Sequence, residues 1–259
     1  MSTTQAEQAE ALKTDPFPYG WRYIKRDLAS GSFTYDQVPL TLEDVLHPQE
    51  GDQIMHNDMH QRICTYLYNV IRGLLAAFPS AVVLQDVRVA WDVPELRPHG
   101  PDIAVIFGVA ERKNWSTFDV SKEGVRPTLI IEVTSPETRR LDLTEKQEEY
   151  DLAGVEYYII VDLVRRRGQV FPLLLGYRQT IDTYTLLSPD ATGRIWIEPL
   201  KIWLGLDGQH VIAYDEAGVA IEDYVELAAS RSTQAAARAA AELRIAELEV
   251  ELRRLRGEQ

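Results

Sequence analysis

Three residues of the chain have the types and the spacing to form one charged site: Asp102, Glu132 and Lys146. Asp102 opens a short apolar stretch, and Glu132 lies inside a longer one. A carboxylate in such surroundings is costly to bury without a partner. Taken alone, Glu132 fits a salt bridge or a sheet edge, and Lys146 fits a solvated edge equally well. Together, two acids and an amine that meet at one place indicate an anionic site with its own counter-charge.

The two acids are expected on strands. The apolar run 128–135 is typical of a buried strand, on which Glu132 and Thr134 share one face because strand side chains alternate. The run 101–107 predicts a shorter strand that begins at Asp102. The sequence therefore offers two carboxylates, each at a defined place on a strand.

A helix after the Glu132 strand is expected to carry the lysine. Segment 142–154 predicts this helix, with Asp142 as its N-cap and Gly154 as its C-terminal stop. Lys146 lies one turn before Tyr150, so both side chains are expected to face the sheet. The apolar segment that follows predicts another strand, and such a strand–helix–strand unit has parallel strands.

The remaining elements are expected on both sides of this unit. Segment 58–78 has the apolar period of a long amphipathic helix, and 81–91 predicts a single strand. Segment 168–205 alternates apolar residues with turn residues, which is typical of β-hairpins. We expect residues 1–20 to be a disordered leader and residues 21–220 to form one domain.

Segment 221–259 differs sharply in composition, because Ala, Glu, Leu and Arg dominate it. It predicts a long helix. Five of its residues are spaced as a short heptad seam: Ala241, Ile245, Leu248, Leu252 and Leu255. A solvated helix packed on its own domain and a coiled coil that makes a homodimer or higher oligomer are both open.

These residues resemble the pattern of a known family, the Uma-two proteins. The pattern is P-D at Asp102, then E-V-T-S-P from Glu132, then D-L-x-E-K-x-x-x-Y from Asp142, then A-G-V-E-Y-x-x-x-V-D. The stretch M-H-Q-R-I inside the first long helix matches as well. The resemblance runs from about Leu40 to Leu206 and is most specific between Pro101 and Asp162.

The resemblance implies an α/β fold, in which a restriction-endonuclease-like core has a mixed central sheet flanked by helices. It implies membership of the PD-(D/E)xK nuclease superfamily, with Asp102 and Glu132 as catalytic acids and metal ligands. The superfamily lysine lies two residues after the glutamate, where this chain has Thr134. The resemblance places that function on Lys146, with Thr134 and Tyr150 as supporting residues. The implied cofactor is Mg²⁺ or Mn²⁺, held by carboxylates and water.

Some further polar residues are weaker candidates. The resemblance places His60 near the site as a supporting residue. His56 and His60 lie four residues apart, which suggests a zinc pair, but no Glu follows His56 and no third ligand is evident, so we expect no zinc here. Arg139 and Arg140 precede the helix and are candidates for phosphate contacts, although solvated turn residues explain them equally well.

The amino-acid composition indicates the cellular compartment and limits the possible binding partners. The chain has 259 residues and one cysteine, so it forms no intrachain disulfide, which suits a reducing compartment. No run approaches the ~20 apolar residues of a membrane span. We expect a cytoplasmic protein without membrane contact. The net charge of −13 weakens the case for binding DNA, although segment 61–130 is close to neutral.

Three functions remain open from the sequence. The first is a metal-dependent DNA endonuclease that hydrolyses phosphodiester bonds. The second is a catalytically weak or silent scaffold for protein–protein association, which the acidic charge favours. The third is a magnesium-dependent phosphodiesterase with a substrate other than DNA. Asp102, Glu132 and Lys146 favour the first, because a silent scaffold needs no such set.

Overall fold

The computed structural model describes most of the chain between residues 16 and 222. The described ranges are 16–17, 19–28, 31–46, 49, 51–54, 58–135, 139–166 and 169–222, with Thr233, Arg238, Glu242, Arg244 and Ile245 beyond them. The chain divides into two compact units, Met1–Val219 and Ala220–Gln259. The first unit carries all the strands described below and the candidate site.

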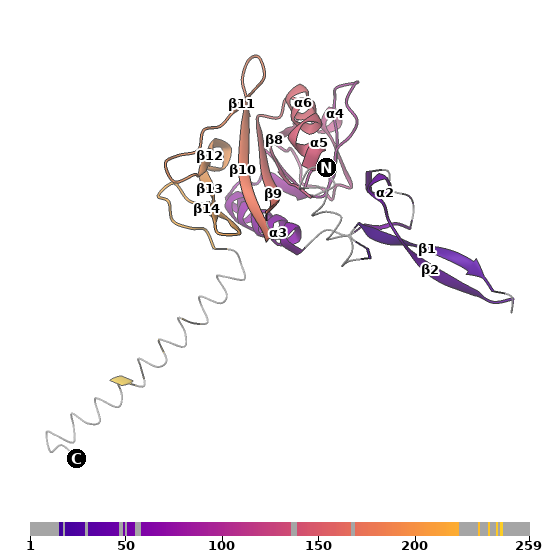
Figure 1. The fold of residues 1–259 in the computed structure, drawn as a ribbon. Coiled ribbons are helices and arrows are strands. Elements are labelled where there is room, and N and C mark those ends of the chain that lie inside the picture. The colour runs from indigo at the N-terminus through magenta and orange to yellow at the C-terminus, as the bar shows by residue number, and fades with distance from the viewer. Residues whose placement is uncertain are drawn as a thin grey trace, which may run out of the picture. The chain divides into compact units, whose positions relative to one another are not determined.

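A six-stranded mixed sheet forms the centre of the first unit (Figure 1). Its order is β11-β10-β9-β8-β6-β4, and every neighbouring pair is antiparallel except β8 and β9, which are parallel. The strands are β4 (Val82–Gln85), β6 (Ile103–Ile106), β8 (Pro127–Val133), β9 (Tyr157–Arg166), β10 (Gln169–Gln179) and β11 (Tyr184–Leu186).

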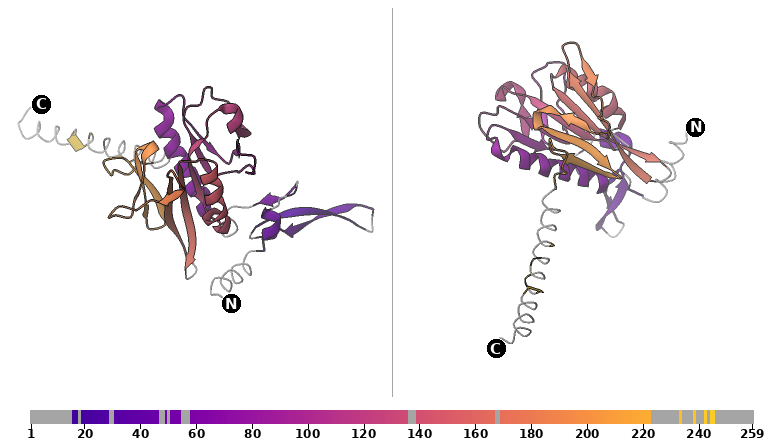
Figure 2. Two further views of the ribbon diagram at one scale, coloured as in Figure 1. Left: turned by 90° about the horizontal axis from the view of Figure 1, so that it is seen from above. Right: turned by 90° about the vertical axis from the view of Figure 1, so that its left-hand side faces the viewer.

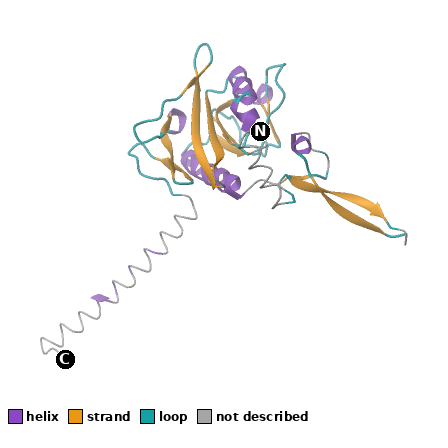
Figure 3. Ribbon diagram, viewed as in Figure 1, coloured by secondary structure: helices purple, strands orange, loops and turns teal. Residues whose placement is uncertain are grey.

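Smaller sheets accompany the central one, so strands dominate the first unit (Figure 3). Their strands are β1 (Gly20–Asp27), β2 (Phe33–Pro39), β3 (Gln53–Ile54), β5 (Arg88–Ala90), β7 (Thr117–Asp119), β12 (Ile195–Ile197), β13 (Ile202–Asp207) and β14 (His210–Tyr214). β2-β1-β3 and β12-β13-β14 are antiparallel sheets, whereas β5 and β7 form a parallel pair.

The central sheet is flanked by α3 (Asp58–Leu74), α5 (Arg139–Leu143) and α6 (Glu145–Leu152) (Figures 1 and 2). The other described helices are α2 (Leu42–Leu46), beside β1 and β2, and α4 (Val120–Glu123), with short 3₁₀ turns at Leu75–Ala77 and Glu198–Leu200. α3 contacts β4, β8 and β14, and the Tyr66 hydroxyl accepts the Ala213 amide at 3.0 Å. The mixed α/β architecture expected from the sequence is therefore confirmed.

The core between the sheet and α6 fixes the orientation of that helix. Tyr150 is fully buried and packs with Ile130 of β8 and with Tyr158 and Ile160 of β9. The Tyr150 and Tyr158 rings meet edge to face, with their centroids 5.0 Å apart. Burying an aromatic or aliphatic side chain of this size contributes about 1.5–3 kcal/mol. Because Glu132 lies two residues after Ile130, it shares the sheet face that α6 covers.

The strand–helix–strand expectation holds, with one change at the helix start. β8 and β9 are parallel, and Gly154 ends the helix in a left-handed conformation, φ +74°. The N-cap assignment of Asp142 was wrong, because Asp142 lies inside α5 and is buried. A break at Thr144 separates α5 from α6, and Thr144 is the N-cap residue of α6.

The single strand expected at 81–91 was also wrong. Asp86 adopts φ +52° between β4 and β5, which ends the first strand. β4 then pairs with β6, while β5 joins β7 in another sheet. Among the described helices none is long and apolar enough to span a membrane.

Two expectations fall largely outside the described residues. Only a few residues of the leader 1–20 are described, and of segment 221–259 only the two residues that open it and five isolated helical positions. Of the heptad positions, Ile245 alone is described, and it is helical and exposed. Ala241, Leu248, Leu252 and Leu255 lie outside the described residues.

Candidate active site

Asp102 and Glu132 meet where β6 begins and β8 ends. The antiparallel register pairs Ile103 with Ile131, so Asp102 lies opposite Glu132. The Asp102 amide donates to Glu132 Oε2 at 3.3 Å, and the Val133 amide donates to Asp102 Oδ2 at 2.7 Å. Each acid is thus bonded to the backbone of the other strand. The structure therefore brings the two acids together through the register of β6 and β8.

Lys146 reaches the same place from α6. Its ammonium group lies 2.9 Å from Glu132 Oε1 and 2.7 Å from Asp142 Oδ1. Asp142 precedes Lys146 by four residues, so the two side chains lie on the same side of the α5–α6 segment. The Tyr150 hydroxyl also donates to Glu132 Oε1, at 2.7 Å. One oxygen of Glu132 thus accepts two strong donors, while Oε2 accepts the longer bond from the Asp102 amide.

Burial sets the charges of this cluster. Burial raises the pKa of Glu132 to about 8, although the Lys146 ammonium lowers it in part. Burial also acts against the charged form of Lys146, but Glu132 and Asp142 outweigh it and raise the lysine pKa. Burial likewise opposes ionisation of Asp102, yet His60 and the Val133 amide keep its pKa below the usual range. Lys146 and Asp102 are therefore charged at neutral pH.

α3 adds two further groups on the Asp102 side. His60 Nε2 lies 3.4 Å from Asp102 Oδ1, and Cys64 Sγ lies 3.8 Å from His60 Nδ1. The possible ligand atoms of His60, Cys64 and Asp102 all lie within 4.8 Å of one another. The sequence-based argument against zinc paired His60 with His56, which lies outside the described residues, and overlooked Cys64. The same spacing of four residues on α3 would have indicated Cys64.

Thr134, two residues after Glu132 on the same strand face, is fully buried. Its hydroxyl donates to Asp162 Oδ1 at 3.0 Å and accepts the Leu163 amide at 2.8 Å. Arg139 forms a two-point contact with the same Asp162 carboxylate, at 2.8 and 2.9 Å. The Thr134 side chain therefore binds the next strand and not the Glu132 carboxylate.

The two arginines before the helix have different surroundings. Arg139 is engaged by the buried Asp162, whereas Arg140 is exposed and pairs with the exposed Glu145 at 2.9 Å. A surface pair of this kind contributes only about 0–1 kcal/mol. Of the two, Arg140 is thus the one that a phosphate can engage without breaking a buried pair.

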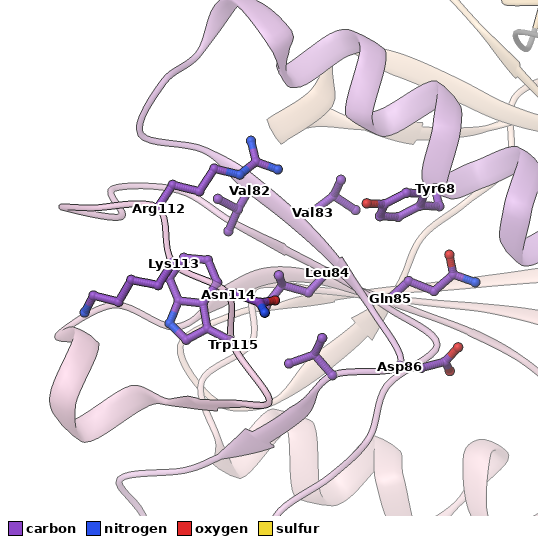
Figure 4. Close-up of a pocket in the computed structure, with 11 residues that line it drawn as sticks. Tyr68, Val82, Val83, Leu84, Gln85, Asp86, Arg112, Lys113, Asn114 and Trp115 are labelled. Atoms are coloured by element: carbon purple, nitrogen blue, oxygen red, sulfur yellow. The ribbon is translucent and has the colours of Figure 1, made fainter.

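A hollow of about 510 Å³ lies along the free edge of β4, beside the site (Figure 4). Tyr68 of α3 borders it on one side, and Arg112 and Lys113 of a loop border it on the other. Asp86 lines the same hollow, and its amide donates to the Asp102 carbonyl at 3.3 Å. The hollow therefore connects with the backbone that carries Asp102.

Comparisons with known proteins identify a matching family and a similar solved structure. The model of the Uma2 family, described as "Putative restriction endonuclease", matches residues 50–202. Among solved structures, a "putative nuclease belonging to DUF820" from Anabaena variabilis ATCC 29413 is similar, with 17% sequence identity and a TM-score of 0.42. That match covers 62% of this chain and 91% of the other. No curated protein matches the chain.

Proposed function

Because the chain belongs to the Uma2 family, we propose that it is a divalent-cation-dependent DNA endonuclease that hydrolyses phosphodiester bonds. Asp102, Glu132 and Lys146 carry the reaction in this proposal. The observation that supports it most directly is the convergence of a buried glutamate, a second acid and a largely buried lysine ammonium where β6 begins and β8 ends. Buried charges of this kind are costly, so a fold that keeps them usually does so at a functional site.

The donor atoms suit a hard divalent cation of the magnesium class, Mg²⁺ or Mn²⁺. Glu132 Oε2 and Asp102 Oδ1 are the carboxylate oxygens that the strong donors of the cluster leave least engaged. The Asp102 side chain is 13% exposed, which gives a cation and its water access to this point. Magnesium takes one or two protein carboxylates and keeps several waters. When bound, such a cation stabilises phosphate charge and makes water more acidic.

The protein groups have separate functions in this proposal. Lys146 stays protonated, so it acts as a fixed positive charge for the scissile phosphate and does not accept a proton. Tyr150 and Lys146 together hold Glu132 Oε1, which aims Oε2 toward Asp102. His60 lies against Asp102 Oδ1 and keeps that carboxylate ionised. The backbone amide of Val133 fixes its second oxygen.

The acidic chain predicts weak binding of DNA that depends on the cation. With a net charge of −13, carboxylates and phosphates repel each other until a divalent ion offsets them. Arg140 is the candidate phosphate contact that its exposed surroundings favour, and Arg139 positions Asp162. Titration of labelled duplex with and without Ca²⁺ tests this, since equal affinity in both conditions contradicts a cation-bridged contact.

Association through segment 221–259 is part of the same proposal. The heptad spacing of this segment suits a homodimer or a higher oligomer. Truncation near Ser230 is expected to leave the first unit folded and to lower the number of chains per particle, measured by light scattering. An unchanged number of chains per particle would show that the segment does not assemble the protein.

Cleavage of plasmid, linear and single-stranded DNA in Mg²⁺ and Mn²⁺ tests the proposed activity. Asp102→Asn and Glu132→Gln keep the shape of each side chain and remove one ligand charge, so each is expected to abolish cleavage. Asp207→Asn, which changes an exposed acid at the β13–β14 turn, is the matched control. Cleavage by Asp102→Asn at the wild-type rate would refute the assignment, as would inactivity of the wild type on every substrate.

A further inference from the structure

His60 and Cys64 lie one helical turn apart on α3, and both are buried against Asp102. The three side chains offer a nitrogen, a sulfur and an oxygen whose positions all lie within 4.8 Å of one another. We propose that His60, Cys64 and Asp102 form a second cation site, selective for borderline-soft divalent ions of the zinc class. Its set of donors differs from the all-oxygen set that suits magnesium.

The distances are close to those of a tetrahedral site. With zinc bond lengths of about 2.0–2.3 Å, tetrahedral geometry places a nitrogen and an oxygen ligand about 3.3 Å apart and a nitrogen and a sulfur ligand about 3.6 Å apart. The structure has 3.4 Å between His60 Nε2 and Asp102 Oδ1, and 4.0 Å between His60 Nε2 and Cys64 Sγ. Cys64 Sγ lies 3.8 Å from His60 Nδ1 and within 4.8 Å of the Asp102 oxygen, so the thiol must rotate toward Nε2 and Asp102 to complete the arrangement. Water supplies the fourth ligand from the exposed side of Asp102.

The charges around this cluster favour a cation as well. The carboxyl groups of Asp86, Asp102 and Glu132 all lie near the two α3 side chains. The Lys146 ammonium forms ion pairs with Glu132 and Asp142 on the other side of the site. A zinc-class ion bound here takes the place of the thiol proton, which passes to solvent when the thiolate bonds to the metal.

The second site and the magnesium-class site share Asp102. Asp102 Oδ2 already accepts the Val133 amide, and Oδ1 is the oxygen that faces His60. A zinc-class ion held by His60 and Cys64 therefore withdraws Oδ1 from the cation that Asp102 and Glu132 bind together. Zinc is then an inhibitor of the nuclease, a consequence that rests on the proposed function. The second site itself does not depend on that function.

Cobalt titration of the full-length protein tests the second site directly. Co²⁺ replaces zinc in such sites and gives a thiolate-to-metal charge-transfer band when sulfur is a ligand. Cys64 is the only cysteine of the chain, so any such band arises from it. We expect one Co²⁺ per chain with that band, lost on addition of Zn²⁺. Absence of the band in the wild-type protein overturns the proposal without any variant.

Variants then measure the affinity. Removing a group that only supports a metal ligand weakens binding about 10–100-fold, so Cys64→Ser and Cys64→Ala are expected to weaken Zn²⁺ binding by at least about 100-fold. His60→Asn should do the same. Melting temperatures of the apo variants establish that each is folded, and His210→Asn, at the exposed first position of β14, is the matched histidine control. Zinc affinity of the Cys64 variants equal to that of the wild type overturns the proposal.

Competition separates this inference from the proposed function. Zn²⁺ should displace Mn²⁺, followed by electron paramagnetic resonance, from the wild-type protein at lower concentration than from Cys64→Ser. If the thiolate band appears but no DNA is cleaved under any condition, the second site stands and the nuclease assignment fails. If DNA is cleaved and zinc inhibits Cys64→Ser as strongly as the wild type, each relative to its own zinc-free rate, the shared-site inference fails.

Discussion

Lys146→Met is expected to destabilise the fold as well as the site. Methionine keeps an unbranched side chain but removes the ammonium that lies 2.9 Å from Glu132 and 2.7 Å from Asp142. Both acids are almost completely buried. Breaking a buried pair by removing one partner costs about 3–5 kcal/mol, because the other charge remains without compensation. We expect the free energy of unfolding to fall by about 3–5 kcal/mol at pH 8, because the buried Asp142 then loses its lysine partner.

The loss should come from Asp142 more than from Glu132. Burial already raises the pKa of Glu132 to about 8 with Lys146 in place, and removal of the ammonium raises it further. In the variant Glu132 therefore stays protonated at pH 5 and for the most part at pH 8, so it carries little unpaired charge at either pH. The double variant Lys146→Met/Asp142→Asn, which removes the second charge, should recover a substantial part of the loss at pH 8.

Urea denaturation followed by circular dichroism at pH 5 and pH 8 measures these differences. Lys201→Met, which breaks only an exposed pair with Glu198, is the control and should change stability by less than about 1 kcal/mol. Equal stability of Lys146→Met and the wild type at pH 8, or no recovery on adding Asp142→Asn, refutes the view that Lys146 neutralises two buried acids. Cleavage rates of Lys146 variants are meaningful only under conditions where these measurements show them folded.

Three further predictions follow from the hydrogen bonds and charges of the site. Tyr150→Phe removes a buried hydroxyl bonded to Glu132 and should cost about 1–3 kcal/mol in urea denaturation; a negligible change would contradict a strong bond there. Arg139→Gln should destabilise the protein more than Arg140→Gln, by about 1–3 kcal/mol, because only Arg139 pairs with the buried Asp162. The pKa of Glu132 is raised to about 8 in the folded state, so the metal-free wild type should lose stability relative to Glu132→Gln as the pH rises from about 5 to about 8. The free energy of unfolding should fall by at most about 1.4 kcal/mol per pH unit and then level off. A pH-independent difference would show that folding does not perturb this carboxyl.

The strand–helix–strand unit could be predicted from the sequence because its signals are local. A buried apolar run, a helical segment ended by a glycine and a second apolar run require one arrangement, and β8 and β9 are parallel as that arrangement demands. The break at Asp86 could not be predicted in this way. The residues on both sides of it have strand propensity, and only pairing with two different partners, β6 and β7, separates them.

The residues of the site also differ in whether local sequence or tertiary contacts reveal them. Asp102 and Glu132 are evident because charged residues border or interrupt apolar segments, and Lys146 because it lies one helical turn before Tyr150. Cys64 and Asp142 are not, since a cysteine on the apolar face of a helix fits the core and an aspartate before a helix fits a cap. Their positions become significant only through tertiary contacts: Cys64 with His60 beside Asp102, and Asp142 with Lys146.

Thr134 explains why the amine of this site comes from a helix. The parallel register places Thr134 beside Asp162, and the threonine hydroxyl bonds to both the Asp162 carboxylate and the Leu163 amide. A lysine at position 134 would therefore meet Asp162, which Arg139 already neutralises, and would break the bond to Leu163. Because the Thr134 side chain links β8 to β9, the amine that reaches Glu132 within the described part of the chain is that of Lys146. Asp142 holds this amine from α5, so its placement depends on the break between α5 and α6, which no strand-borne lysine would require.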